Sequence, residues 1–387
     1  MGHRVAIIGS GQSKYVFKRP ELGTPELVFQ VTTAALADAG LTRDDVDAVV
    51  FGSAPEAFEG VNTPDKWCAG PAAALGKPLM RIHTGGATGG STALAAYAHV
   101  ASGLADVVVA VAIQRMGESP SAQRILNTIW DPIYEKDLPL NIIVMAALRA
   151  NGYMQRYGFT ERHMAQVAVK NRRNGVLNDY AQLRREITIE DVFNSRVLCS
   201  PIKLFDACPR SDGACAVIFA SERFVKARGA SAAWIKGVGS LSDTYFVGDR
   251  LGDDMRCFAR ATKRAYDMSR ITEPRKQVQV VELYAAFSYM ELVAYHTLGL
   301  CDEGAGGEFI ESGGPEIGGQ TPVNPSGGPM CSHPIGATGL VRVAEAASQV
   351  LGRAGKHQIQ GARTAVATSQ GGATQFFTVM VIGADLD

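Results

Sequence analysis

The stretch NPSGGPMCSHPIGATG, from Asn324 to Gly339, is the most specific segment of this sequence and the one from which its fold is inferred. Its last four residues, Gly336-Ala337-Thr338-Gly339, open a helix, and Gly86-Ala87-Thr88-Gly89 opens an earlier one. A β-rich run follows each helix, at 107–113 and at 364–367. A chance match of four small residues is one explanation. The other is a duplicated α/β unit in which two helix amino termini offer free backbone N–H groups to one site.

The rest of the chain supports this organisation. Strands are predicted at 4–8, 46–52, 80–83, 107–113, 213–220 and 278–283, alternating with helices at 24–40, 89–103 and 254–268. This alternation predicts a mostly parallel sheet covered on both faces. Residues 116–200 have more charge and more aromatic residues, with helices at 142–157 and 160–174, and are interpreted as an inserted helical region. The expected domains are 1–115 plus 201–225, the insertion 116–200, and 226–387.

Composition excludes several classes of function. The 38 basic residues balance the 38 acidic ones over 387 residues, so nothing favours nucleic acid or an acidic membrane surface as a partner. The uncharged stretch 82–105 contains His83, His99 and several glycines, which favours a buried helix of a water-soluble core, with His99 as a hydrogen-bonded core residue. No signal peptide is recognised, so a cytoplasmic location is expected. The seven cysteines have no metal-ligand spacing and indicate reduced thiols without a metal site.

The first strand ends in Gly9-Ser10-Gly11, a partial dinucleotide fingerprint. Lys14 stands at the third glycine position, and no acidic residue follows the next strand to hold a ribose. A tight turn is therefore predicted here, and no nucleotide cofactor.

His333 lies on the Gly- and Pro-rich loop immediately before the second of these helices, and Pro334 restricts the backbone beside it. The whole string 324–339 resembles the carboxy-terminal active-site loop of thiolases, especially the sterol-carrier-protein-X type. Three further segments are similar to that family: ALADAGLTRDDVDAVVFGS, ITIEDVFNSRVLCSPIKLFDACPRSDGACAVIFAS and LGLCDEGAGGEFIESGG. The resemblance implies a duplicated, five-layered αβαβα fold, a homodimer and acyl-CoA substrates, with coenzyme A as part of the substrate and no separate cofactor.

The chain departs from the thiolase pattern at the catalytic thiols. Gly86 stands where the resemblance places the nucleophilic cysteine, so an acyl-enzyme cannot form there. Ser369, in Ser369-Gln370-Gly371, replaces the second cysteine. Tyr284 in ELYAAF occupies the position of a histidine in the sterol-carrier type. The remaining matches are His333 and the backbone N–H groups of Gly86 and Gly371, which correspond to the anion-stabilising positions of the family.

A similar pattern occurs in thiolase-related aldolases of steroid side-chain degradation. They have a tyrosine in this position, no nucleophilic cysteine, and an IHxGG sequence that Ile82-His83-Thr84-Gly85-Gly86 matches. His83 is therefore a candidate substrate-binding residue, together with Gly86, Gly371 and Ser369. Those aldolases carry a second tyrosine where this chain has His333.

Three hypotheses follow. The first is retro-aldol cleavage of a β-hydroxyacyl-CoA with a bulky, steroidal or aromatic, acyl group, in which Tyr284 and His333 act as the acid and the base in either order. The second is acyl transfer by Cys331, which stands two residues before His333 in the loop. The third is a silent subunit of a heteromeric complex. A small zinc-ribbon and OB-fold protein is the partner that the resemblance implies.

Overall fold

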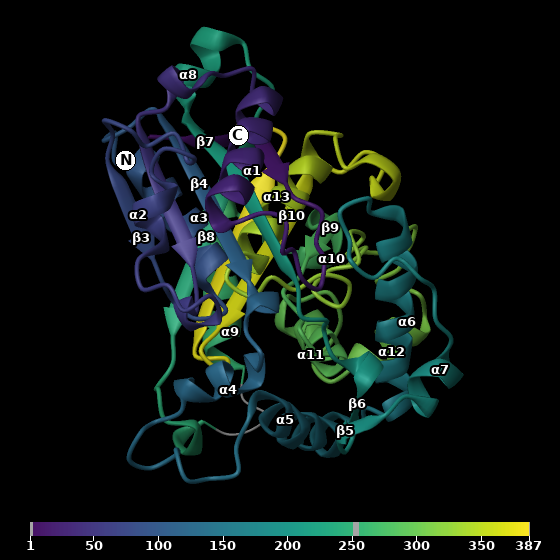
Figure 1. The fold of residues 1–387 in the computed structure, drawn as a ribbon. Coiled ribbons are helices and arrows are strands. Elements are labelled where there is room, and N and C mark those ends of the chain that lie inside the picture. Colours follow the sequence, from purple (N-terminus) through teal and green to yellow (C-terminus); the bar gives the residue numbers. More distant parts are fainter. Residues whose placement is uncertain (1–2, 251–254, 387) are drawn as a thin grey trace.

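The order of the strands repeats across the single large sheet of the molecule (Figure 1). The structure is a computed structural model that describes residues 3–250 and 255–386. The strands follow the order β3-β2-β4-β7-β1-β8-β11-β10-β9. Their bounds are β1 Val5–Gln12, β2 Ala48–Ser53, β3 Leu79–Ile82, β4 Val107–Arg115, β7 Asp212–Ser221, β8 Ala233–Ser242, β9 Val280–Glu282, β10 Thr364–Gly371 and β11 Phe376–Gly383.

The two halves of the sheet have the same topology. The order β2-β4-β7-β1 in one half corresponds to β9-β10-β11-β8 in the other, and the halves meet where β1 pairs with β8 at Ala6↔Trp234 and Ile7↔Ala233. In each half the first pair is parallel and the next two pairs are antiparallel. Even the edge strand β3 has a counterpart, because Val323 makes a parallel bridge to Val281 of β9. The duplication predicted from the repeated GATG sequence is confirmed.

The prediction of a mostly parallel sheet is wrong. Only the pairs β2–β3, β2–β4 and β9–β10 are parallel among the pairs between described strands. In each half the last strand returns beside its predecessor in the opposite direction, most directly at β10 and β11, which a short turn connects. The alternation of strands and helices along the sequence gives no information about this reversal of strand direction.

Helices cover both faces of the sheet and give the five expected layers. The helix α1 (Thr24–Asp38) lies outside the amino-terminal half, α3 (Thr88–Ala101) and α13 (Thr338–Val350) lie between the halves, and α9 (Arg256–Ser269) and α11 (Ser288–Thr297) lie outside the carboxy-terminal half. Three buried apolar clusters fill the spaces between these layers. Residues 107–113 of β4 are buried on both faces, which explains their uninterrupted apolar sequence.

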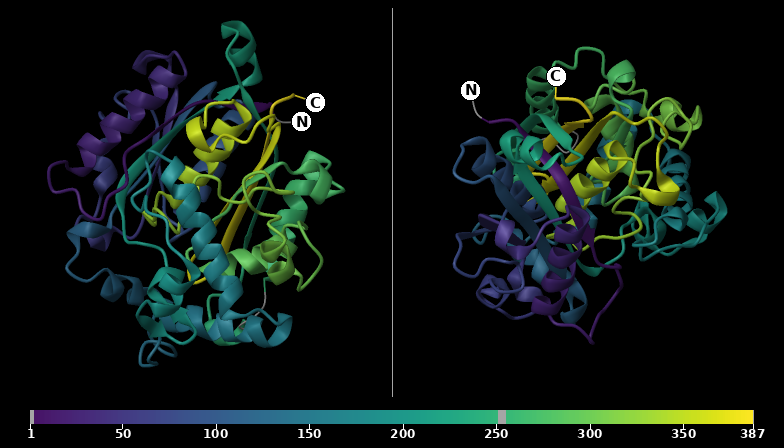
Figure 2. Two further views of the ribbon diagram at one scale, coloured as in Figure 1. Left: turned by 90° about the vertical axis from the view of Figure 1, so that its right-hand side faces the viewer. Right: turned by 90° about the horizontal axis from the view of Figure 1, so that it is seen from above.

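The inserted region packs on the carboxy-terminal half, as the two views of Figure 2 and the teal and green segments of Figure 1 show. Helix α5 (Ile142–Tyr157) starts where the Asn141 side chain accepts hydrogen bonds from two backbone N–H groups, and it ends at Gly158 with φ of 71°. Helix α6 (Glu161–Leu177) lies beside α11 and α12 (Gly306–Glu311). The remaining elements are α2 Pro64–Cys68, α4 Ala122–Leu126, α6 Glu161–Leu177, α7 Ile189–Asn194, β5 Val197–Cys199, β6 Ile202–Lys203, α8 Glu222–Arg228, α10 Pro274–Gln277 and α12 Gly306–Glu311.

The predicted turn at Gly9-Ser10-Gly11 is also wrong, because β1 continues through these residues with a register shift after Ile7. Both glycines let α1 approach the strand closely: a Cβ at Gly9 would lie 2.7 Å from the Ala35 carbonyl oxygen, and one at Gly11 would lie 2.3 Å from that of Val31. Across residues 3–250 and 255–386, no helix has the length and apolar character needed to span a membrane.

Candidate active site

The structure brings His333 and Tyr284 together. Their rings meet edge to face, with centroids 5.4 Å apart and an interplanar angle of 83°. Tyr284 follows the end of β9, and His333 lies in the loop before α13. Both are nearly enclosed, at 4% and 5% exposure. Two residues 49 positions apart in the chain thus lie with their rings in contact.

The surroundings of His333 fix its ring and keep it neutral. Its backbone N–H donates to Ser211 Oγ at 2.9 Å, and its Nδ1 lies 3.1 Å from Thr338 Oγ1. Burial, reinforced by the positive charge of Arg342, lowers the pKa of His333 to about 3. The imidazole is therefore uncharged at neutral pH.

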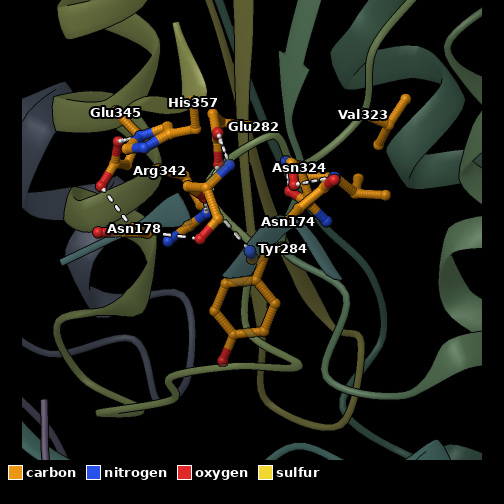
Figure 3. A network of polar contacts seen from close by, with 12 residues as sticks. Asn174, Asn178, Glu282, Tyr284, Val323, Asn324, Arg342, Glu345 and His357 are labelled. Atoms are coloured by element: carbon orange, nitrogen blue, oxygen red, sulfur yellow. Dashed lines mark hydrogen bonds and ion pairs between the residues drawn. The ribbon is translucent and has the colours of Figure 1, made fainter. Parts of the chain in front are cut away.

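Tyr284 is held through its backbone, and its ring points away from the polar groups behind it (Figure 3). Its N–H donates to Thr368 Oγ1 at 2.9 Å, and its carbonyl accepts from Gln370 Nε2 at 2.7 Å. Burial raises the pKa of Tyr284 well above its usual value, with a smaller contribution from Cys208. The phenol consequently keeps its proton at neutral pH.

Gly86 and Gly371 form the other side of the site. A Cβ on Gly86 would lie 2.8 Å from the Tyr284 hydroxyl oxygen, and one on Gly371 would lie 2.6 Å from the Gly86 nitrogen. Helices α3 and α13 begin beside them without a side-chain cap at Ala87 or Ala337. Two uncapped helix amino termini therefore lie near Tyr284 and His333, as the repeated sequence predicts.

The other two candidate residues take different places. Ser369 is buried below the two helix starts, with its Oγ 3.4 Å from the Ala87 carbonyl oxygen, and a Cβ on Gly339 would lie 2.3 Å from that Oγ. His83 is exposed on the surface just past β3. Burial of part of its ring lowers the pKa of His83, and the charged groups that act on it are Glu56 and Arg81. His99 is half-buried, and its Nδ1 lies 2.8 Å from the Ala95 carbonyl oxygen.

Two buried polar networks hold the loop before His333 in place, and Figure 3 labels Arg342 and Glu282 of the first and Asn324 of the second. In the first, Arg342 of α13 pairs with Glu282 of β9, and both bond to Ser326 of the loop. Glu282 comes two residues before Tyr284. This network therefore connects the segments that carry both candidate residues, Tyr284 and His333.

The second network joins the loop to the inserted region. Lys170 of α6 pairs with Glu291 of α11 at 2.7 Å, and both side chains are fully buried. Asn324 donates to Glu291 at 3.3 Å and accepts from the Leu283 N–H at 2.7 Å, immediately before Tyr284. The insertion thus helps to position the site as well as cover it.

Cys331 does not face His333. Its Sγ lies 3.2 Å from the Asn171 carbonyl oxygen, against α6, and a Cβ on Gly175 would lie 2.5 Å from it. Burial raises the pKa of Cys331 to about 12. A neutral thiol with its sulfur on a backbone carbonyl is poorly prepared to act as a nucleophile.

Sequence reasoning missed three residues at this site. Ser211 and Thr338 orient His333, and both stand inside strings that resemble thiolases. Cys208 interacts electrostatically with Tyr284, and its N–H donates to the Ala286 carbonyl oxygen at 2.8 Å. Thr338 follows His333 by only five residues, whereas Ser211 and Cys208 reach their partners because segment 207–211 lies beside loops that are distant in the sequence.

Comparison with known proteins defines the class. The thiolase amino-terminal domain matches residues 5–223, and the thiolase carboxy-terminal domain-like family matches residues 242–384. This chain belongs to the thiolase superfamily and is similar to its sterol-carrier-protein type.

Individual relatives differ in their described activities. The chain is 31% identical to an acetyl-CoA acetyltransferase of Methanothermobacter thermautotrophicus, covering 95% of this chain and 96% of that one. It is 31% identical to sterol carrier protein 2 of Bos taurus, covering 94% of this chain and 69% of that one. It is also 31% identical to the benzoylsuccinyl-CoA thiolase subunit BbsB of Thauera aromatica, covering 92% of this chain and 91% of that one. Among solved structures, the Ltp2-ChsH2(DUF35) aldolase has a TM-score of 0.85 at 26% identity, covering 100% of this chain and 99% of that one.

Proposed function

We propose that this protein cleaves a β-hydroxyacyl-CoA by a retro-aldol reaction, releasing an aldehyde or ketone and a shortened acyl-CoA. The observation that carries the proposal is the position of the Tyr284 hydroxyl, which fills the space that a side chain at residue 86 would need. A proton donor thus takes the place of a nucleophile. The similarity to a structure described as an aldolase supports the same reaction.

The reaction balances without a covalent intermediate. Nε2 of His333 accepts the β-hydroxyl proton, while Nδ1 carries its own proton and donates to Thr338. The bond between the α- and β-carbons breaks, the β-carbon becomes a carbonyl, and the electron pair forms a thioester enolate. Backbone N–H groups of Gly86 and Gly371 stabilise the enolate oxygen. Tyr284 donates a proton to the α-carbon and recovers one from His333, so neither water nor free coenzyme A is consumed.

The substrate we propose has a bulky acyl group. Support comes from the relatives described as sterol carrier protein 2 and as a benzoylsuccinyl-CoA thiolase subunit. Acyl transfer is the competing reaction, and the acetyltransferase relative favours it. It would require a sulfur nucleophile, whereas the Cys331 sulfur lies against α6.

Two kinds of partner belong to the proposal. A second copy of the chain would pair along β3, the edge strand of the amino-terminal half, where Met80 is 47% exposed. A small partner protein is supported by the aldolase structure, whose description includes a DUF35 component. Light scattering and co-purification test the two associations separately.

The test is product analysis by mass spectrometry after incubation with a panel of β-hydroxyacyl-CoA and β-ketoacyl-CoA esters, with and without free coenzyme A. The expected result is a carbonyl product and a shortened acyl-CoA from the β-hydroxy esters, independent of free coenzyme A. Release of acetyl-CoA or propionyl-CoA only when coenzyme A is added would identify an acyltransferase. Cys331→Ala would then decide whether that thiol is the nucleophile. No turnover by the isolated chain, with turnover on adding a partner, would identify a supporting subunit.

A further inference from the structure

Tyr284 lies just beyond the end of the ladder that joins β9 to β10. The last pair of this parallel ladder is Glu282↔Ala367, where β9 ends. Two residues further on, Tyr284 is bonded to β10 through side chains. Its N–H donates to Thr368 Oγ1 at 2.9 Å, and its carbonyl oxygen accepts from Gln370 Nε2 at 2.7 Å. Side chains of β10 thus hold Tyr284 where the backbone pairing has stopped.

The two side chains are suited to this task by their place on the strand. Thr368 and Gln370 are two residues apart, so they lie on the same face of β10 and can hold the two sides of one residue. Both are buried. Since a backbone carbonyl oxygen only accepts hydrogen bonds, the amide atom of Gln370 that faces Tyr284 is the nitrogen. Loss of either bond would leave a buried polar group without its partner, which is costly.

Gln370 also connects Tyr284 to the glycine side of the site. A Cβ built on Gly86 would lie 2.8 Å from the Tyr284 hydroxyl oxygen and 3.1 Å from the Gln370 backbone carbonyl oxygen. Gly371 is the next residue, and a Cβ on it would lie 2.6 Å from the Gly86 nitrogen. The side chain of Gln370 therefore holds the phenol-bearing residue, while its backbone belongs to the segment that carries the Gly371 N–H.

We propose that Gln370 and Thr368 are positioning residues for Tyr284, and that their side chains set the place of its phenol relative to the backbone N–H groups of Gly86 and Gly371. This inference rests on the proposed function for the role of the phenol as the proton donor. Proton transfer needs donor and acceptor within about 3 Å, and a displacement of about 1 Å can lower a rate about a hundredfold. Both residues act on the reaction through Tyr284.

The first test is kinetic. Gln370→Glu keeps the length of the side chain but places a carboxylate oxygen against the Tyr284 carbonyl oxygen. At about pH 8, kcat for retro-aldol cleavage should fall about ten- to a hundredfold and KM should change less than about twofold, because a proton donor is displaced and substrate binding is kept. Burial raises the pKa of such a carboxyl group, so kcat should recover towards about pH 5.5 as the protonated group donates again. His333, with a pKa of about 3, stays uncharged over this range.

Gln349→Glu is the matched control. Its buried amide also donates to a backbone carbonyl oxygen, that of His357 at 2.8 Å, and it lies near the end of α13. This variant should keep the wild-type kcat at both pH values. A kcat that falls as far in Gln349→Glu as in Gln370→Glu would show a general effect of burying a carboxyl group and would overturn the proposal.

Two further sets of variants show whether the effect passes through Tyr284. Thr368→Val should lower kcat with little change in KM, and Thr368→Ser, which keeps the hydroxyl group, should restore it. In the Tyr284→Phe background, adding Gln370→Glu should change kcat less than about twofold, because the group that Gln370 positions is already absent. A full, independent loss in the double variant would overturn the proposal.

A spectroscopic measurement does not depend on the reaction. In protein labelled with 3-fluorotyrosine, the fluorine NMR resonance of Tyr284 is assigned by its loss in Tyr284→Phe. It should shift in Gln370→Glu at about pH 8, return towards the wild-type position at about pH 5.5, and stay in place in Gln349→Glu. This pattern in a protein that shows no retro-aldol turnover would support the positioning contacts and contradict the proposed reaction. Turnover in the wild type with an unmoved resonance in Gln370→Glu would overturn the positioning role alone.

Discussion

The two GATG segments have the same sequence and the same place at the start of a central helix, but they contribute different chemistry. Thr338 of the second segment contacts Nδ1 of His333. Thr88 of the first instead accepts from the Thr84 N–H at 3.0 Å and donates to the Gly85 carbonyl oxygen at 2.6 Å. One threonine orients an imidazole, and the other closes a backbone turn around Gly86. The two helix starts are duplicated, but the loops before them differ, and these loops determine which groups each segment contributes to the site.

The largest effect is expected from removing the imidazole that Thr338 of the second segment contacts, or the Tyr284 side chain packed against that imidazole. His333→Ala and Tyr284→Phe should each lower kcat/KM for retro-aldol cleavage by about 10²- to 10⁴-fold, because each removes one partner in proton transfer. Steady-state assays of carbonyl product measure the loss. Cys331→Ala is the control and should keep most of the activity. Unchanged turnover in His333→Ala would remove the basis for the proposed mechanism.

Adding a side chain to the first segment should cost stability. Gly86→Cys places a Cβ against the Tyr284 hydroxyl, and such overpacking costs about 1–3 kcal/mol of unfolding free energy. Combining it with Tyr284→Phe should recover part of the loss, as a double-mutant cycle by thermal or urea unfolding will measure. Gly336→Cys is the matched control, since its Cβ would instead meet Gln114 and Ala54. Equal recovery of both cysteine variants by Tyr284→Phe would show that the contact at Gly86 is unimportant.

Substituting the two threonines separates orientation from folding. Thr338→Val should lower kcat/KM by about tenfold, the effect of losing one hydrogen bond to the imidazole. Thr338→Ser should restore it. Thr88→Val should lower the unfolding free energy by about 1 kcal/mol and reduce activity less than Thr338→Val does. If Thr88→Val costs more activity than Thr338→Val, the division of roles between the two segments is wrong.

The smallest expected effects concern how activity and stability depend on pH. Because the folded pKa of His333 is about 3, its imidazole does not change charge near neutrality, and kcat/KM should vary less than about twofold between pH 6 and 8 from this group. The unfolded chain binds a proton near pH 6.5 and the folded chain does not, so His333 makes stability fall as pH drops from about 6.5 towards 3.

His357 should behave in the opposite way. Although burial opposes it, the Glu345 carboxylate 2.9 Å away raises the pKa of His357. Its contribution to stability is present below about pH 6.5 and is lost as pH rises through the folded pKa. Urea unfolding across this range should show His357→Gln flattening the alkaline side of the stability curve and His333→Gln the acid side. The reverse assignment would contradict these pKa shifts.

The sequence alone predicted much of the fold. Gly and Pro in the 324–339 loop, the repeated GATG and the apolar strands located the duplicated unit, and α5 begins and ends at the predicted residues, Ile142 and Tyr157. These features are local, since periodicity and turn chemistry act within a few residues. Tyr284, His333, Gly86 and Gly371 were also identified from the sequence, through the resemblance to thiolases.

Only the tertiary structure decided how these residues act. The tertiary structure sets strand direction, the exposure of His83 and the neutral state of the buried His333 ring. It also places the Cys331 sulfur against Asn171 and the His333 backbone against Ser211, and both partners are far away in the chain. Burial and electrostatic interaction depend on which distant segments are packed together, and no local pattern in the sequence encodes that.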